Sequence, residues 1–162
     1  MNGRPRIDAE ATLPERLGDI GLSNFAPYLM NRIMGRYNAS IRSEMAKLGL
    51  TTPKMRALAV LTVIEAPLIR DLAVYAVVEQ STLSRALDQL EAEGLVRREG
   101  DAEDNRATRV LVTDAGRVAF DTLWPHMAAT YARMFRGIPD EERRAFIGTL
   151  HKILGNVRRH EF

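Results

Sequence analysis

One continuous stretch, residues 79–117, constrains the fold most. Apolar residues in it recur at intervals of three and four, which predicts a helix over residues 80–93 with one apolar face. Gly94 then stands where a left-handed C-terminal cap is expected. Two segments of alternating apolar and polar residues follow, LVRRE and TRVLVT, with the turn-forming residues of GDAEDN between them. The stretch therefore predicts a helix that leads into a two-stranded hairpin.

The residues just before this stretch predict two further helices. The segment LIRDLAVYAV has apolar residues in helical register and is separated from the helix at 80–93 by a tight break, as in a helix-turn-helix. Upstream, TTPKMRALAVLTVIEAP predicts a helix with Thr52 as its cap and Pro53 at its first position, where the missing N–H is not needed. Val77 stands in the turn. Since a β-branched residue is unfavourable at positive φ, we expect an ordinary backbone conformation there or a different register.

Long amphipathic helices are expected on both sides of this region. Apolar residues follow a helical spacing from Ser23 to Leu50 and again over residues 114–159, where Pro125 is expected to kink the chain unless it starts a new segment. These helices carry more large apolar residues than a small helix-turn-helix core covers, among them Phe25, Leu29, Trp124, Met127, Phe135, Phe146 and Leu150. The surplus favours a partner chain, with packing inside the chain as the alternative.

Composition excludes several function classes. With no cysteine, the chain has no disulfide, thiol nucleophile or Cys-ligated zinc, and its scattered histidines, His126, His151 and His160, make a poor metal set. No nucleotide-binding, metalloprotease or hydrolase motif is present, so we expect neither an enzyme nor a cofactor. No apolar run reaches the roughly 20 residues that span a bilayer, and the first residues lack the apolar core of a signal peptide. We therefore expect a cytoplasmic protein without a membrane partner.

Charge is informative through its distribution. The net charge of +2 is small for a nucleic-acid-binding protein. Between residues 31 and 56, however, basic residues far outnumber acidic ones, since Glu44 is the single acid. They are Arg32, Arg36, Arg42, Lys47, Lys54 and Arg56. This stretch either meets phosphate or forms an ordinary solvated helical face.

The outer face of the helix at 80–93 is polar and suited to DNA. A helix fits the major groove, where short polar side chains and arginine distinguish base edges. Such side chains gather toward the N-terminal end of this helix, the end that reaches bases in helix-turn-helix proteins. The alternative is structural: Ser81 or Thr82 caps the helix, and Arg85 forms a surface pair with Asp88 or Glu79.

The same stretch resembles the MarR family, the multiple-antibiotic-resistance type of winged helix-turn-helix transcription regulator. The resemblance covers the recognition helix, its exit, the wing and the entry into the next helix. It is carried by Leu90, Glu91, Gly94, Leu95, Val96, Arg98, Asp104, Arg106, Val112, Thr113 and Gly116. The order of the flanking helices also matches, so the resemblance extends from Ser23 to Arg159.

The resemblance implies a set of DNA contacts. Ser81, Thr82, Ser84, Arg85 and Gln89 are expected on the DNA side of the recognition helix. Arg106 is expected in the minor groove, with Asp104 holding it through a carboxylate–guanidinium pair, while Arg98, Arg109 and the basic stretch are sources of phosphate contact. Asn105 stands where many family members have a second arginine, which lowers the charge of the wing.

The resemblance also implies the architecture. The expected fold is mainly α with a small β-hairpin (α+β), a single winged helix-turn-helix domain over residues 1–162. Residues 1–22 form an N-terminal extension, residues 23–50 and 114–159 the dimerisation helices, and residues 51–113 the DNA-binding lobe. A two-fold homodimer is expected to read a palindromic operator with half-sites roughly 34 Å apart.

The resulting hypothesis is a dimeric repressor that a small, commonly aromatic, ligand releases from double-stranded DNA. Candidate ligand-binding residues are Tyr28, Tyr37, Arg56, Trp124, Met127 and Tyr131. The alternative is that these residues are ordinary core, since aromatic and Met side chains at helical spacing usually are. A winged helix that binds protein instead of DNA, as an adaptor, is the alternative function.

Overall fold

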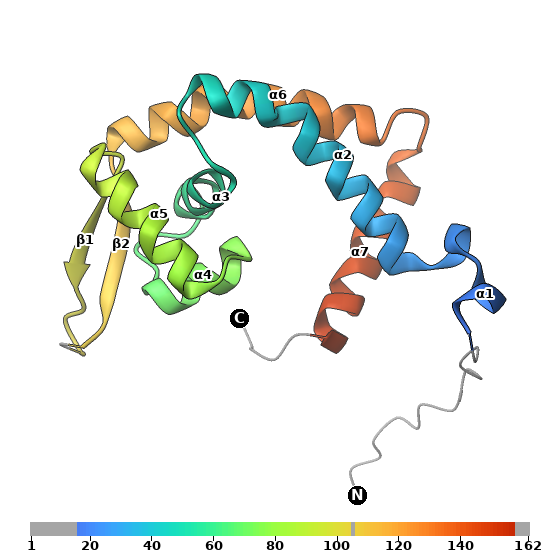
Figure 1. Cartoon of the computed structure of the whole chain (residues 1–162), viewed down its shortest axis with the longest axis horizontal. Helices are drawn as coiled ribbons and strands as arrows, with labels where there is room; N and C mark the ends of the chain where they lie inside the picture. Colours follow the sequence, from blue (N-terminus) through green and yellow to red (C-terminus); the bar gives the residue numbers. More distant parts are fainter. Residues whose placement is uncertain (1–15, 105, 158–162) are drawn as a thin grey trace, which may run out of the picture. The chain divides into compact units, whose positions relative to one another are not determined.

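The computed structural model describes residues 16–104 and 106–157, and it is mainly helical with one two-stranded antiparallel hairpin (Figure 1). The elements are α1 (Leu17–Ile20), a 3-10 turn η1 (Leu22–Asn24), α2 (Ala26–Lys47), α3 (Thr52–Leu61), α4 (Ile69–Ala76), α5 (Gln80–Ala92), β1 (Val96–Gly100), β2 (Thr108–Val112), α6 (Asp114–Met134) and α7 (Asp140–Val157). This confirms the predicted fold class. The first 15 residues of the expected N-terminal extension and Asn105 lie outside the described residues.

The chain divides into two compact units, residues 1–39 and 40–162. In the first unit Gly21, at φ 73°, separates α1 from η1, and α2 begins at Ala26. The apolar stripe of α2 within this unit is largely exposed, with Leu29 at 40% and Ile33 at 45%. Farther along the same helix, in the second unit, the stripe becomes buried.

The core of the second unit is formed by α3, α4, α5, α6, the hairpin and the last turns of α2. Its fully buried large side chains are Ile41, Leu58, Leu72, Leu83, Leu87, Leu90, Leu123 and Val110. They include Leu83, Leu87 and Leu90, which form the apolar face of the helix predicted over residues 80–93. The helix α3 begins one residue earlier than expected: Thr51 is its N-cap, so Thr52 is the first helical residue and Pro53 the second.

The turn between α4 and α5 differs from the prediction. Val77 adopts the left-handed conformation, at φ 52° and ψ 52°. Two backbone hydrogen bonds hold it there, from Val77 N–H to Val74 (3.1 Å) and from Val78 N–H to Ala73 (3.0 Å). In addition, Arg56 on α3 donates to the Val77 carbonyl at 3.0 Å. The expected ordinary conformation was wrong because these bonds outweigh the local steric cost of a β-branched residue at positive φ.

The hairpin is the predicted wing. Its register pairs Val96 with Val112 and Gly100 with Thr108. The wing is also joined to the chain just before α4, because the Val110 N–H donates to the Pro67 carbonyl at 3.0 Å. Gly94 has the predicted positive φ, 71°. The wing is thus fixed to the helix-turn-helix at its base and along β2.

The helix α6 starts where the wing ends. Thr113 caps it by accepting the Gly116 N–H at 3.1 Å, and the Thr113 hydroxyl donates to the Gly94 carbonyl at 2.7 Å. A Cβ on Gly116 would lie 2.0 Å from the Leu95 carbonyl oxygen, which explains the glycine. The helix then runs through Pro125 without starting a new segment.

The last helix, α7, is the least buried of the long helices. None of its described residues is buried, and Phe146, Leu154 and Val157 are 44%, 55% and 69% exposed. Its contact with α6 is partly aromatic, with the Phe135 and Phe146 ring centroids 6.2 Å apart. In the part of the chain that the structure describes, no helix is long and apolar enough to cross a membrane.

Candidate nucleic-acid interface

The outer face of α5 carries the polar residues that the sequence placed there. Ser81, Thr82, Arg85 and Gln89 are exposed, and Ser84 is half-buried. The N-cap is Glu79, which makes no side-chain capping bond, so neither Ser81 nor Thr82 caps the helix. Among the described residues Arg85 has no ion pair with Asp88 or Glu79. The structural alternative for these side chains therefore finds no support.

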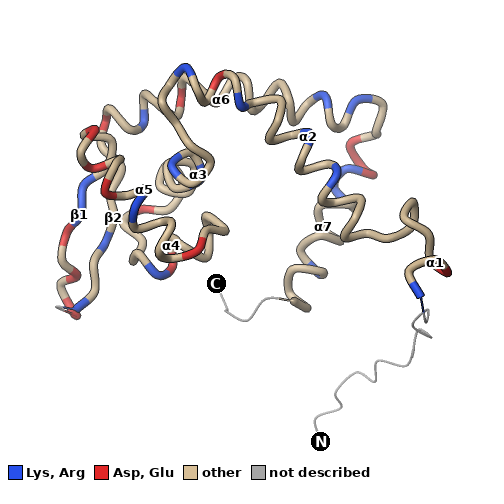
Figure 2. The backbone as a smooth tube through the Cα atoms, viewed as in Figure 1, with Lys and Arg blue, Asp and Glu red and all other residues tan. Residues whose placement is uncertain are grey.

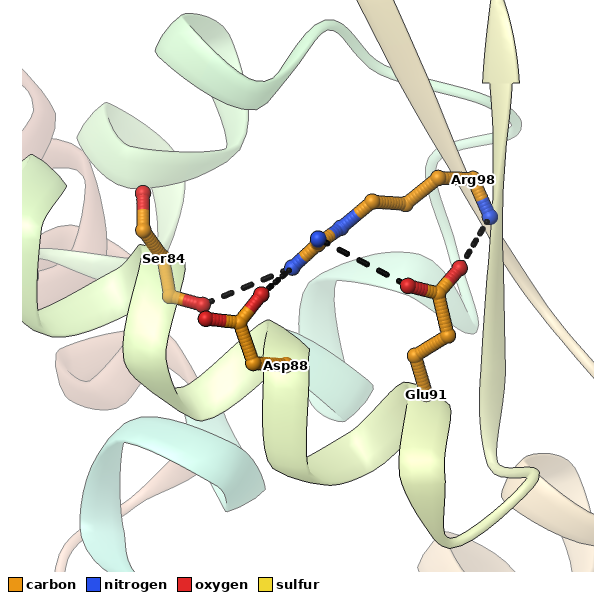
Figure 3. Close-up of polar contacts among 4 residues, drawn as sticks. All are labelled: Ser84, Asp88, Glu91 and Arg98. Carbon is orange, nitrogen blue, oxygen red and sulfur yellow. Dashed lines mark hydrogen bonds and ion pairs between the residues drawn. The ribbon is translucent and has the colours of Figure 1, made fainter.

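Arg98 on β1 reaches back to α5 and makes several contacts there (Figure 3). Its Nη2 donates to Asp88 Oδ1 at 2.7 Å and to the Ser84 carbonyl at 3.4 Å, and its Nη1 lies 3.6 Å from Glu91 Oε2. The Arg98 backbone N–H donates to Glu91 Oε1 at 3.1 Å. With its side chain only 25% exposed, Arg98 joins the wing to the recognition helix and neutralises the acids on it. The sequence offered Arg98 as a source of phosphate contact, and in the structure its guanidinium is engaged by partners on α5.

The tip of the wing is organised by two acids. Asp101 Oδ1 accepts the N–H groups of Glu103 and Asp104, each at 2.9 Å. Asp104 Oδ1 accepts the backbone N–H of Arg106 at 2.9 Å. Asp104 thus holds Arg106 in position through the backbone, and the expected pair with the guanidinium is absent among the described residues. The Arg106 side chain is left exposed at the tip.

Arg109 on β2 is also engaged inside the protein. Its Nε pairs with the buried carboxylate of Asp101, and its Nη1 donates to the Ala66 carbonyl at 2.8 Å. The hydrogen bonds from the Glu103 and Asp104 N–H groups, together with Arg109, lower the pKa of Asp101. Arg109, which the sequence offered as a source of phosphate contact, therefore fixes the wing to the loop before α4.

Basic residues between residues 31 and 56 also have partners inside the protein. Lys54 is 3% exposed, and its Nζ donates to Glu93 Oε1 at 2.7 Å and to the Gly49 carbonyl at 3.0 Å. This links the C-terminal end of α5 to the start of α3. Lys47 pairs with Glu44 at 2.8 Å. In the C-terminal half of this stretch the basic side chains thus mainly hold parts of the protein together.

An open cleft of about 440 Å³ lies between α4, α5 and the wing. Its lining comprises Leu68, Ile69, Arg70, Gln80, Ser84, Asp104, Arg106, Ala107 and Thr108. Figure 2 shows Lys and Arg on each of these elements. The cleft places Gln80 and Ser84 of α5 beside Arg106 of the wing tip, and it adds Arg70, which was not expected from the sequence. Its exposed position in the first turn of α4 was readable from the sequence, but its proximity to the wing was not.

The candidate ligand-binding residues lie elsewhere. Tyr28 and Tyr37 belong to the first compact unit, where the Arg32 guanidinium lies 5.8 Å from the Tyr28 ring centroid and burial raises the pKa of Tyr37. On α6, Met127 is buried, while Trp124 and Tyr131 are 53% and 40% exposed. None of the candidates lines the cleft described above.

Comparison with known proteins shows the family. The sequence model of the MarR family matches residues 48–107, from the end of α2 to the wing tip. A crystal structure of a MarR-family transcriptional regulator from Silicibacter pomeroyi is 59% identical, with a TM-score of 0.86 over 91% of this chain and 99% of that chain. The chain belongs to the MarR family. Members of this family are DNA-binding transcription factors that act as dimers, and this MarR protein is a DNA-binding transcriptional regulator.

Two other relatives of this MarR protein are more distant. CouR from Rhodococcus jostii RHA1, whose crystal structure holds p-coumaroyl-CoA, is 27% identical with a TM-score of 0.73, over 82% of this chain and 94% of CouR. The transcriptional repressor IacR from Pseudomonas putida is 23% identical over 83% of this chain and 80% of IacR. Neither the matches nor the geometry of the cleft favours a protein-binding adaptor.

Proposed function

We propose that this MarR protein is a homodimeric repressor that binds a palindromic operator through α5 and the wing and is released by a small aromatic effector. In this proposal residues 51–113 are the DNA-binding lobe, and residues 23–50 and 114–159 form the dimer. The observation that carries it is the cleft at which Gln80 and Ser84, in the N-terminal half of α5, lie beside Arg106 of the wing tip. Two different DNA-reading elements are thereby presented side by side.

The major groove is read by the N-terminal half of α5. Ser81, Thr82 and Arg85 project from the face opposite the buried Leu83 and Leu87, with Ser84 and Gln89 at its borders. Their hydroxyl and guanidinium groups match the donors and acceptors of base edges, and arginine pairs best with guanine. The acids toward the C-terminal end of α5 do not repel the duplex strongly, because Arg98 neutralises Asp88 and Glu91.

The minor groove is read by Arg106. A guanidinium is favoured in a narrow minor groove, where the negative potential is concentrated. Asp104, Asp101 and Arg109 keep the wing tip in shape without touching DNA themselves. Arg98 has the same kind of role at the base of the wing. The proposed interface thus consists of contacting residues on the surface and positioning residues behind them.

The dimer is proposed from exposed apolar residues outside the DNA-binding lobe. They are Leu29, Ile33, Met34, Trp124, Tyr131, Met134, Ile138, Phe146, Ile153, Leu154 and Val157. Monomeric proteins rarely expose so much large apolar side-chain surface. A two-fold dimer formed by these helices presents two copies of α5 to successive major grooves, roughly 34 Å apart.

The effector is proposed from the kind of ligand that CouR holds, an aromatic acyl thioester. In the second unit Trp124, Met127 and Tyr131 supply the aromatic and polarisable surface that an aromatic ring prefers, and Arg56 a positive charge. In the first unit Tyr28 and Tyr37 supply aromatic surface of the same kind. Because Arg56 also holds the turn between α4 and α5, a ligand that drew its guanidinium away would disturb the recognition helix.

Fluorescence anisotropy tests the proposal. A labelled duplex from upstream of the gene's own coding sequence is compared with a random duplex of equal length. We expect tighter binding to the former, with affinity that falls steeply with salt, by roughly 0.9 logarithmic unit per neutralised phosphate. Arg85→Ala is expected to reduce the preference for the operator and Arg106→Ala to weaken binding. Salt-independent binding, or unchanged affinity in both variants, would contradict the proposal.

A further inference from the structure

We infer that the cleft between α4, α5 and the wing holds one phosphate of the DNA backbone, and that Arg70 is the principal cation for it. The inference rests on the proposed function, because it takes α5 as the major-groove element and Arg106 as the minor-groove element. It adds a residue and a site that the family resemblance did not supply. No other described cation on α4 lines the cleft.

The first argument is geometric. In a duplex, a major groove and the neighbouring minor groove are separated by a single sugar–phosphate strand. A protein that inserts α5 into one groove and Arg106 into the other must therefore have that strand between them. The surface between them is the cleft, since Gln80 and Ser84 of α5 line one side and Arg106 and Thr108 of the wing line another. Arg70 of α4 completes the lining.

The second argument is chemical. The lining offers guanidinium, hydroxyl and amide donors from Arg70, Ser84, Thr108 and Gln80, which are the groups that bind phosphate oxygens in protein–DNA complexes. A guanidinium also matches the planar pair of oxygens on a phosphodiester. Because the cleft is open to solvent, a backbone phosphate can enter it from outside without a rearrangement of the fold.

The third argument concerns which arginine is free. Arg98 and Arg109 are held by internal partners, whereas the Arg70 side chain is 73% exposed. Its ion partner in the described structure is the adjacent Asp71, at 3.6 Å, with a side chain that is itself 43% exposed. Such an exposed pair contributes little and is readily exchanged for a phosphate. The acid in the cleft, Asp104, is directed at the Arg106 backbone N–H.

The test starts with Arg70→Ala and a matched control, Arg144→Ala. Arg144 is an exposed arginine on the face of α7 opposite its apolar stripe, so it lies outside both the DNA-binding lobe and the proposed dimer contacts. Loss of one phosphate contact is expected to weaken binding roughly eightfold at 0.1 M salt and to lower the salt slope by about 0.9. The loss is expected equally on operator and random duplexes, because a phosphate contact carries no sequence information.

The role of the charge is separated from a structural role by Arg70→Lys and by thermal unfolding. Lysine keeps the charge but not the fork of the guanidinium. We therefore expect Arg70→Lys to retain most of the salt slope and all three variants to melt as the parent protein does. A lower melting temperature for Arg70→Ala, with an unchanged salt slope, would overturn the inference.

The phosphate itself is located by duplexes that carry a single neutral methylphosphonate, moved one position at a time along the operator. At one position on the strand between the two grooves, neutralisation is expected to weaken the parent protein about as much as Arg70→Ala does and to weaken Arg70→Ala no further. If every position weakens both proteins by the same factor, Arg70 has no phosphate partner and the inference is wrong.

Failure of the inference is distinguishable from failure of the proposed function. If Arg70→Ala behaves like Arg144→Ala while Arg85→Ala and Arg106→Ala lose affinity, the cleft is empty of phosphate but α5 and the wing still bind DNA. If the parent protein shows no salt-dependent binding to either duplex, the proposed function fails and the cleft assignment with it.

Discussion

The helices α5 and α7 have the same kind of apolar periodicity but opposite degrees of burial. In α5, Leu83, Leu87 and Leu90 are completely buried against the rest of the lobe. In α7, Leu154 is 55% exposed and no described residue is buried. Periodicity therefore predicts a helix with a face to cover, but it does not say what covers it. The apolar face of α5 packs against other elements of the same chain. We propose that the apolar face of α7 packs against a second copy of the chain.

The largest effect is expected from a substitution in the buried apolar face of α5. Leu87→Ala removes a side chain with no exposed surface, and it is expected to lower the free energy of unfolding by about 2 to 5 kcal/mol. Denaturant unfolding of a dilute sample measures it. The matched control, Leu154→Ala, removes the same atoms from a half-exposed site and is expected to cost much less in the monomer. Equal losses at the two sites would mean that α7 is as well covered in the monomer as α5.

The next effect is expected from a substitution in the exposed apolar face of α7. Leu154→Asp places a carboxylate in the proposed dimer interface, where desolvation penalises it, and we expect the dimer dissociation constant to rise by more than about tenfold. Sedimentation equilibrium over a range of concentrations measures this change.

Gly148→Asp is the control for that substitution. It adds the same charge on the face of α7 opposite the apolar stripe, at a residue whose added Cβ has nothing within 4 Å. Its dissociation constant is expected to remain that of the parent. If both aspartates weaken association equally, the effect is one of net charge, and the apolar stripe is not the interface.

Local spacing explains why so much of the fold was predictable. The element types, the wing and the left-handed Gly94 all follow from residues close together in the chain. The N-cap of α3 was misplaced by one residue because Thr51 and Thr52 are equally good caps, so the sequence alone does not choose between them. The conformation of Val77 was missed because it depends on Arg56, a residue of another helix.

A smaller effect is expected at the junction of α5 and the wing. Arg98→Ala leaves Asp88 and Glu91 without their partner and is expected to lower the free energy of unfolding by about 1 to 2 kcal/mol (Figure 3). DNA affinity is also expected to fall, although Arg98 faces α5. Arg97→Ala, on the same strand, removes an exposed pair with Glu99 and is expected to change stability by less than about 0.5 kcal/mol.

Neutralising Asp88 and Glu91 distinguishes two roles of Arg98, which are to cancel their charge and to orient the wing. In the Arg98→Ala background, Asp88→Asn with Glu91→Gln is expected to restore most of the DNA affinity if repulsion of phosphate causes the loss. If affinity stays low while stability recovers, the orientation of the wing is what Arg98 controls. An Arg98→Ala variant with unchanged stability and unchanged affinity would contradict both roles.

The candidate site shows where prediction from sequence stops. Periodicity placed Ser81, Thr82 and Arg85 on the outer face of α5 correctly. It did not distinguish arginines that are free from those with internal partners, because the partners of Arg98 and Arg109 lie on other elements and depend on the strand register. Arg70 was missed for the same reason, since α4 and the wing meet only in the folded chain.

The smallest effect concerns a residue for which local preference and tertiary structure disagree. Val77 is held at positive φ with its side chain 75% exposed, so its substitution by glycine removes strain and loses little burial. The left-handed conformation costs a non-glycine residue about 1 to 2 kcal/mol, and glycine's greater freedom in the unfolded chain offsets about 0.5 to 1 kcal/mol of that gain. Val77→Gly is thus expected to raise the free energy of unfolding by about 0.5 to 1 kcal/mol in denaturant titrations. Val74→Gly, inside α4, is expected to lower it by about 1 kcal/mol. If Val77→Gly also destabilises, then the valine contributes packing that its exposure does not reveal, and the turn between α4 and α5 is held by more than its backbone bonds and Arg56.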